Sequence, residues 1–233
     1  IEEMDLDTIL QVHPEIVIVD ELAHTNVEGC RHAKRWQDVM ELLDAGINVL
    51  SAVNIQHIES LNDEVRTMVG IDVRERIPDS VIREADEVVN IDLTAEELVE
   101  RLKAGKIYAK EKIQTALDNF FKTDNILQLR ELALKEVALR VGKKVADEVM
   151  PKTRNARGVA KLVVCVSSNN ATQQHIIRKA ARMADIHDAE LVALYVQTPG
   201  ENTDSIPLNT QRHLINHLEL VVELGGKVHK VES

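Results

Sequence analysis

Residues 16–21 of the chain are Ile16-Val17-Ile18-Val19-Asp20-Glu21, four apolar residues followed by two acids. A β-branched run of this kind predicts a buried strand of the type found in parallel sheets that are covered on both faces. The alternation continues, with strands expected at 47–54 and 87–92 and helices at 32–44, 55–69, 79–85 and 94–105. Strands separated by helices predict crossover connections, so the fold class is α/β with a parallel sheet.

A second alternating unit follows later in the chain. Its apolar runs predict strands at 161–166, 190–197 and 227–231, and its periodic stretches predict helices at 172–186 and 208–224. We expect a first domain at 1–109, a two-helix bridge at 110–150, a polar basic linker at 151–160 and a last domain at 161–233. Because three strands make a poor complete sheet, we expect the last domain to continue beyond Ser233.

Composition narrows the classes of function. The chain has 233 residues, and its first hundred carry 24 acids and 7 bases, which argues against general nucleic-acid binding. Its two cysteines, Cys30 and Cys165, match no disulfide or zinc-ribbon spacing, which favours a reducing cytosol. No apolar run approaches the ~18 residues of a membrane helix. We therefore expect a cytoplasmic segment.

The apolar run that ends in Asp20 and Glu21 matches the Walker B pattern of P-loop nucleotidases. A buried strand delivers such carboxylates to the sheet edge where ligands bind. Asp20 would hold a magnesium ion through its waters, and Glu21 would act as the catalytic base that polarises the attacking water. The alternative is an ordinary strand followed by a helix-capping Asp. The pattern alone leaves both interpretations open.

Two further polar residues belong to the same hypothesis. Asn54 ends the next predicted strand, where it would sense a terminal phosphate or simply form a turn. His24 follows the acidic pair closely and would either relay nucleotide state or form a local turn. The sequence holds no GxxxxGK[ST] loop, so either this is not a P-loop protein or the phosphate cradle lies upstream of Ile1, as the start of the chain within helix-like sequence leads us to expect.

Several longer stretches are specific enough to compare with a known family. They include Val19-Asp20-Glu21-Leu22-Ala23-His24-Thr25-Asn26, Lys34-Arg35-Trp36-Gln37-Asp38-Val39, Val53-Asn54-Ile55-Gln56-His57-Ile58-Glu59-Ser60-Leu61-Asn62-Asp63 and Leu129-Arg130-Glu131-Leu132-Ala133-Leu134. These stretches resemble the N-terminal domain of the KdpD family of osmosensitive potassium sensor kinases, over residues 1 to about 150. From Lys161 the chain resembles the universal-stress-protein-like domain of the same family.

The resemblance implies a regulatory role. It predicts a P-loop-type domain that senses ATP or ADP with magnesium, a helical bridge and the start of a universal-stress-protein-like α/β domain. The partners would be the membrane and kinase domains of the same sensor histidine kinase and the response regulator that controls potassium uptake. The full-length protein would then lie in the inner or plasma membrane, with this segment in the cytoplasm.

The resemblance also implies a second ligand and leaves two other functions open. Some family members bind cyclic di-AMP through a Ser-x-Ser pair and a later aromatic-Thr-Ala-x-Tyr segment. Here Ser168-Asn169-Asn170 and Leu191-Val192-Ala193-Leu194-Tyr195 occupy that spacing, so Asn170 and Leu191 depart from the pattern while Ser168 keeps it. The other functions are ATP hydrolysis with Glu21 as base, and a nucleotide-independent scaffold that docks a partner.

Overall fold

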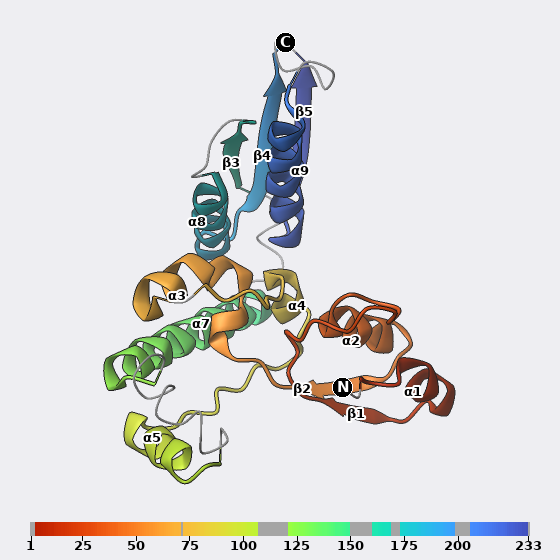
Figure 1. The fold of residues 1–233 in the computed structure, drawn as a ribbon. Coiled ribbons are helices and arrows are strands. Elements are labelled where there is room, and N and C mark those ends of the chain that lie inside the picture. Colours follow the sequence, from red (N-terminus) through yellow and green to blue (C-terminus); the bar gives the residue numbers. More distant parts are fainter. Residues whose placement is uncertain are drawn as a thin grey trace.

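The computed structural model describes residues 3–70, 72–106, 121–149, 160–168, 173–198 and 206–232. In this part of the chain two parallel sheets form, one with the order β1–β2 and one with the order β3–β4–β5 (Figure 1). The prediction of an α/β fold with parallel sheets is thus confirmed.

The described residues up to 149 are called the N-terminal unit, and those from 160 onward the C-terminal unit. The N-terminal unit contains α1 (Leu6–Val12), β1 (Ile16–Val19), α2 (Arg35–Asp44), β2 (Asn48–Ser51), the 3₁₀ turns η1 (Ile55–His57) and η2 (Glu59–Leu61), α3 (Asn62–Val69), α4 (Asp79–Arg83), α5 (Ala95–Lys103) and α7 (Thr123–Val149).

The β1–β2 sheet is covered on one face only. The buried side chains of β1 and α2 join one core, to which Leu129 and Leu132 of α7 also belong. On the opposite face Ile18 is 80% exposed and Leu50 57% exposed. Because strand side chains alternate between the faces, this pattern means that one side of the sheet has no cover among the described residues. The expectation that β1 is buried on both faces is therefore wrong for this part of the chain.

Two other predictions for the N-terminal unit are also wrong. Residues 87–92 form no strand, and the side chains of Val89 and Ile91 are exposed. The helix expected at 55–69 begins only at Asn62, since η1 and η2 occupy its first half. There a parallel bridge between Ile58 and Ile77 draws the backbone away from the helical path. Thr94 and Glu97 form a capping box at the start of α5, within the helix expected at 94–105.

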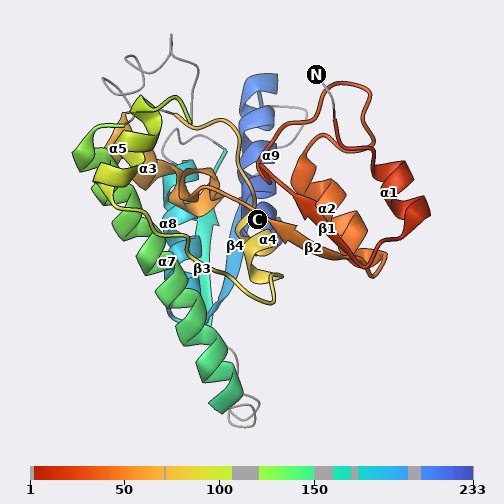
Figure 2. The ribbon, with the colours of Figure 1, turned by 90° about the horizontal axis from the view of Figure 1, so that it is seen from below.

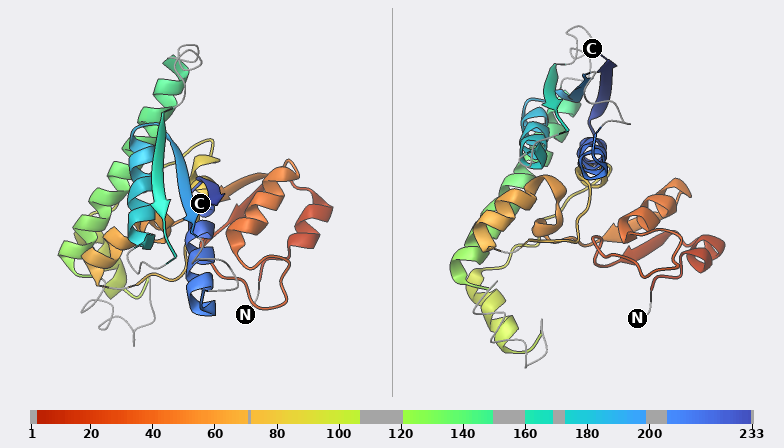
Figure 3. Two further views of the ribbon diagram at one scale, coloured as in Figure 1. Left: turned by 90° about the horizontal axis from the view of Figure 1, so that it is seen from above. Right: turned by 45° about the horizontal axis from the view of Figure 1, so that its top comes forward.

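The C-terminal unit follows the predicted pattern closely. It contains β3 (Lys161–Val166), α8 (Gln173–Ile186), β4 (Glu190–Gln197), α9 (Leu208–Glu223) and β5 (Lys227–Glu232). All strand pairs are parallel, and α8 and α9 pack together with the strands around a second core (Figure 3). Both crossovers step in the same direction along the sheet, so the right-handed rule places the two helices on one face.

The two units meet along α8. Figure 1 shows α3 and α7 beneath α8, with α4 near the lower end of α9, whereas α1, α2 and the β1–β2 sheet lie to one side. Seen from below, α2 lies on one side of the molecule, and α5 and α7 lie on the opposite side (Figure 2). Among the described residues, no helix combines the length and the apolar character needed to cross a bilayer.

Candidate functional site

Asp20 and Glu21 lie directly after β1, at the carboxyl edge of the β1–β2 sheet. Glu21 has a φ of 52°, and its N–H donates to Asp20 Oδ1 at 2.8 Å, so the chain turns sharply here. The next N–H, from Leu22, donates to the carbonyl of Ala52 at 3.1 Å and holds the segments after the two strands side by side. Both acidic side chains are exposed.

Asn54 lies on the same edge, after β2. It precedes η1, and its carbonyl accepts the N–H of His57 at 3.0 Å. The side chain of Asn54 is exposed and does not cap η1. The parallel pairing therefore brings Asp20, Glu21 and Asn54 to one edge of one sheet, although more than thirty positions separate Asn54 from the acidic pair in sequence.

His24 is placed differently from these three. Its Nε2 lies 2.9 Å from Glu3 Oε1, and the ring is half-buried. The hydrogen bond from His24 and the weaker one from Arg35 outweigh burial and hold the pKa of Glu3 below its ordinary value. In the described structure His24 thus fixes the loop after β1 onto the start of the chain.

Arg35 is a residue of this edge that the sequence patterns did not identify. It opens α2, and its guanidinium donates to the carbonyl of Asp20 at 3.1 Å and to Glu3 Oε2 at 3.2 Å. Its Nε is buried without a hydrogen-bond partner among the described residues. A positive charge in the first turn of a helix is electrostatically unfavourable. The position of Arg35 at the start of a predicted helix is therefore the one feature of the sequence that could have indicated its role.

The edge offers carboxylates but not a complete metal cage. Among the described residues no group of three or more His, Cys, Asp or Glu side chains is close enough to hold a metal ion. Magnesium commonly binds through one or two carboxylates, with waters and substrate phosphates as the remaining ligands. The exposed pair of Asp20 and Glu21 fits that donor set, provided that a phosphate is supplied beside them.

At the carboxyl edge of the second sheet the candidate side chains are buried. Ser168, just after β3, is 5% exposed, and Tyr195 near the end of β4 is buried. His217 of α9 is buried nearby, with its ring stacked 6.5 Å from that of His213. Burial, and then the charge of His213, lower the pKa of His217 below its ordinary value. Asn170, the other residue of the Ser168 motif, lies outside the described residues.

A buried ion pair that no sequence pattern indicates joins the two units. Arg178 of α8 donates to Glu59 Oε1 of η2 at 2.7 and 3.0 Å, and each side chain is only 7% exposed. Asp63 lies 3.4 Å from the same guanidinium and also contacts His175 Nδ1 at 3.1 Å. Buried charges of this kind need partners, so the contact fixes how α8 sits on η2 and α3.

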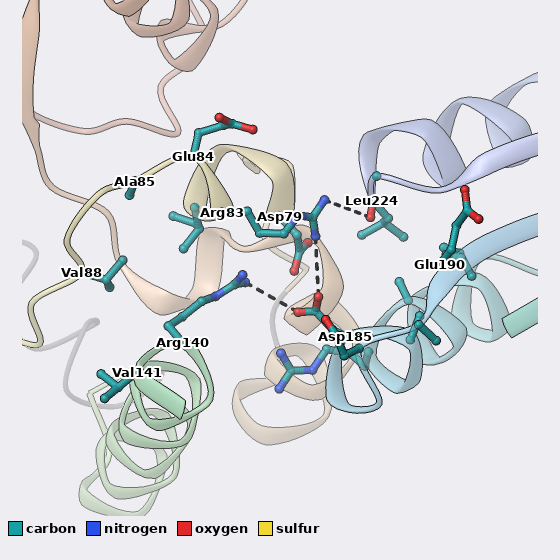
Figure 4. Close-up of a pocket in the computed structure, with 18 of the residues that line it drawn as sticks. Asp79, Arg83, Glu84, Ala85, Val88, Arg140, Val141, Asp185, Glu190 and Leu224 are labelled. Carbon is teal, nitrogen blue, oxygen red and sulfur yellow. Dashed lines mark hydrogen bonds and ion pairs between the residues drawn. The ribbon is translucent and has the colours of Figure 1, made fainter. Parts of the chain in front are cut away.

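A second group of charges lines a cavity of about 1220 Å³ between the units. Figure 4 shows Arg83 and Arg140 converging on Asp185 of α8, at 3.9 and 3.8 Å. Arg83 also donates to the carbonyl of Leu224, the residue that ends α9, at 3.3 Å. The C-terminus of a helix carries a partial negative charge, so the cationic Arg83 side chain is favourable at this position.

The fold and these edges define a two-unit α/β segment with exposed polar side chains at one sheet edge and buried ion pairs between the units. The family model described as "Osmosensitive K+ channel His kinase sensor domain", KdpD, matches residues 1–141. The chain belongs to this family.

Curated relatives match almost the whole chain. The chain is 41% identical to "Sensor protein KdpD" of Escherichia coli over 97% of its length, and 42% identical to the protein of that name of Mycobacterium tuberculosis over 98%. It is 43% identical to "Putative sensor protein KdpD" of Synechocystis sp. over 93%. The chain spans 25% and 26% of the first two relatives and 59% of the third.

Proposed function

We propose that this chain is the regulatory segment of a two-component sensor histidine kinase that responds to potassium supply, and that it reads ATP or ADP at the β1–β2 edge. Membership of the KdpD sensor-domain family supports the first part. The convergence of Asp20, Glu21 and Asn54 on one carboxyl edge is the observation that carries the second. The names of the relatives favour sensing over hydrolysis or a purely mechanical scaffold.

The remainder of the proposed sensor lies outside this chain. The membrane and kinase domains, a phosphate-binding loop upstream of Ile1 and the response regulator of the potassium system would act with it. This segment would lie in the cytoplasm, attached to a protein of the inner or plasma membrane. The C-terminal unit would belong to a universal-stress-protein-like domain that begins at β3.

Each residue at the β1–β2 edge has a distinct task in this proposal. Magnesium would neutralise charge on the phosphates, and Asp20 would hold the waters of that ion. Asn54 would donate its amide to the terminal phosphate and so distinguish ATP from ADP. Arg35 keeps the Asp20 carbonyl in place, which fixes the direction of the acidic pair. Glu21 would orient a water beside the terminal phosphate.

Ser168 gives the proposal a second ligand, cyclic di-AMP, at the other sheet. Its position beside β3 and the register of Tyr195 with Val166 support a site at that edge. Both side chains are buried, so the ligand would need the edge to open.

The test is calorimetric titration of the full-length protein with ATP and magnesium. Asp20→Asn removes the charge that holds the ion and should weaken binding by at least about tenfold, the equivalent of ~1.4 kcal/mol. Glu15→Gln is the matched control, because Glu15 is an exposed acid at the opposite end of β1. Equal affinities of Asp20→Asn and the unaltered protein would refute the nucleotide site.

A further inference from the structure

We infer that residues 52–61, the segment between β2 and α3, couple the β1–β2 edge to the C-terminal unit through the Glu59–Arg178 ion pair. The inference rests on the proposed function, since it names the route by which nucleotide at that edge would be reported to the rest of the protein. One end of the segment carries Asn54 and the other carries Glu59. The two side chains are therefore five positions apart.

The backbone of this segment is built from two successive 3₁₀ turns. The N–H of His57 donates to the carbonyl of Asn54 at 3.0 Å, and the N–H of Leu61 donates to that of Ile58 at 3.1 Å. The hydrogen bonds of 3₁₀ turns are less well aligned than those of an α-helix, and such turns often mark hinges. A pull on Asn54 would reach Glu59 through one such turn.

The loop after β1 is connected to the same segment. Glu75 accepts the N–H of Thr25 through Oε1 at 3.1 Å, and its carbonyl contacts His57 Nδ1 at 2.7 Å. Ile77 then bridges both turns, donating to the carbonyl of His57 at 2.8 Å and accepting the N–H of Glu59 at 3.0 Å. Both loops of the carboxyl edge thus converge on the backbone next to Glu59.

The far end of the segment is sensitive to small movements because the charges there are buried. Glu59 pairs with Arg178 of the C-terminal unit and lies 3.5 Å from Arg76 of its own unit. Burial, together with the charges of Glu59 and Glu219, raises the pKa of Glu223, so the acidic groups here compete for two guanidiniums. A buried guanidinium that loses its carboxylate partner strongly destabilises the folded protein. Movement of Glu59 would therefore shift the balance between docked and undocked α8.

The experiment is hydrogen–deuterium exchange of the full-length protein with and without ATP and magnesium, read in peptides from α8. ATP should change the exchange of α8 in the unaltered protein. The double variant Glu59→Gln and Arg178→Gln keeps a neutral buried pair, and its α8 should lose the response to ATP while calorimetry still detects ATP binding. The control is Glu131→Gln with Lys135→Gln, an ion pair on α7 whose side chains are both 64% exposed; this variant should respond fully.

The outcomes separate the two proposals. If the unaltered protein binds no ATP, the proposed function fails and the coupling fails with it. If ATP binds but α8 either does not respond or responds equally in the double variant, the coupling alone is overturned. Should the double variant not fold, Arg178→Lys takes its place. Lys keeps the charge but lacks the planar fork, so a reduced α8 response supports the coupling and an unchanged response refutes it.

Discussion

The two sheets of this protein are both parallel, yet their carboxyl edges differ. At the β1–β2 edge Asp20, Glu21 and Asn54 are exposed, whereas at the edge of the β3–β5 sheet Ser168 and His217 are buried. The topology that gathers polar side chains is the same in both. What differs is the burial of these side chains, because the described residues enclose Ser168 and His217 but leave Asp20, Glu21 and Asn54 open. Access for a ligand is thus decided by packing around the sheet, and the first edge is the better candidate.

The largest expected effect comes from breaking the buried ion pair between Glu59 and Arg178, which holds the two units together. Arg178→Ala leaves the buried Glu59 with only the longer 3.5 Å contact to Arg76, and the free energy of unfolding should fall by about 3 kcal/mol, the lower end of the range for breaking a buried ion pair. Urea denaturation followed by the fluorescence of Trp36, the sole tryptophan, reports on the N-terminal unit. A loss there would show that this unit depends on the C-terminal unit.

The control for this prediction is Lys135→Ala, which removes one partner of an ion pair on α7 that is open to water. Such pairs contribute about 0–1 kcal/mol. If Arg178→Ala lowered the free energy of unfolding no more than Lys135→Ala does, the Glu59–Arg178 ion pair would not stabilise the protein and the two units would be independent.

A smaller effect is expected where α9 ends against the N-terminal unit. Gly225 has a φ of 79°, and a Cβ placed there would clash with the guanidinium of Arg83. Gly225→Ala should cost about 1–2 kcal/mol in backbone strain and displace Arg83 as well. Gly70→Ala is the matched control, because Gly70 ends α3 with a φ of 71° and has no heavy atom within 4 Å of that position.

Urea denaturation of both glycine variants isolates the contact between the units. Gly225→Ala should be the more destabilised of the two, and adding Arg83→Ala should remove most of the difference. Equal losses in the two variants would mean that Arg83 does not hold the end of α9.

The smallest effect concerns pH and the buried His217 of the C-terminal unit. Because burial lowers the pKa of His217, the folded protein binds a proton there less readily than the unfolded chain, whose pKa is near 6.5. The stability contributed by neutral His217 is present above pH 6.5 and is lost progressively as the pH falls from there through the lower pKa of the folded protein. Denaturation at pH 7 and pH 5.5 should show that His217→Phe, which cannot titrate, loses less stability than the unaltered protein. Parallel losses would contradict a buried neutral His217.

Sequence patterns located most of the fold because continuous apolar runs specify strands. The runs at β1, β3 and β4 were recognised for that reason, and the parallel arrangement then placed Asp20 and Asn54 at one edge. The pattern at 87–92 also contains β-branched residues, but a strand needs a partner strand, and none pairs with it in the described structure. The sequence of a segment does not show whether another strand lies beside it in the fold.

The joint between the units could not be predicted for the same reason. Glu59 and Arg178 are 119 positions apart, and each looks like an ordinary surface charge in its own helix or turn. The helical pattern also continued through η1 and η2, because it does not reveal the bridge from Ile58 to Ile77. These features follow from tertiary contacts, which override local preference.

The most direct measurement is a structure of the full-length protein with ATP and magnesium bound. The nucleotide-sensing proposal requires the terminal phosphate within about 3 Å of the Asn54 amide and the carboxylate of Asp20 among the ligands or waters of the ion. A nucleotide bound elsewhere, with Asp20 and Asn54 both facing bulk water, would contradict the proposal and leave the first sheet edge without a function.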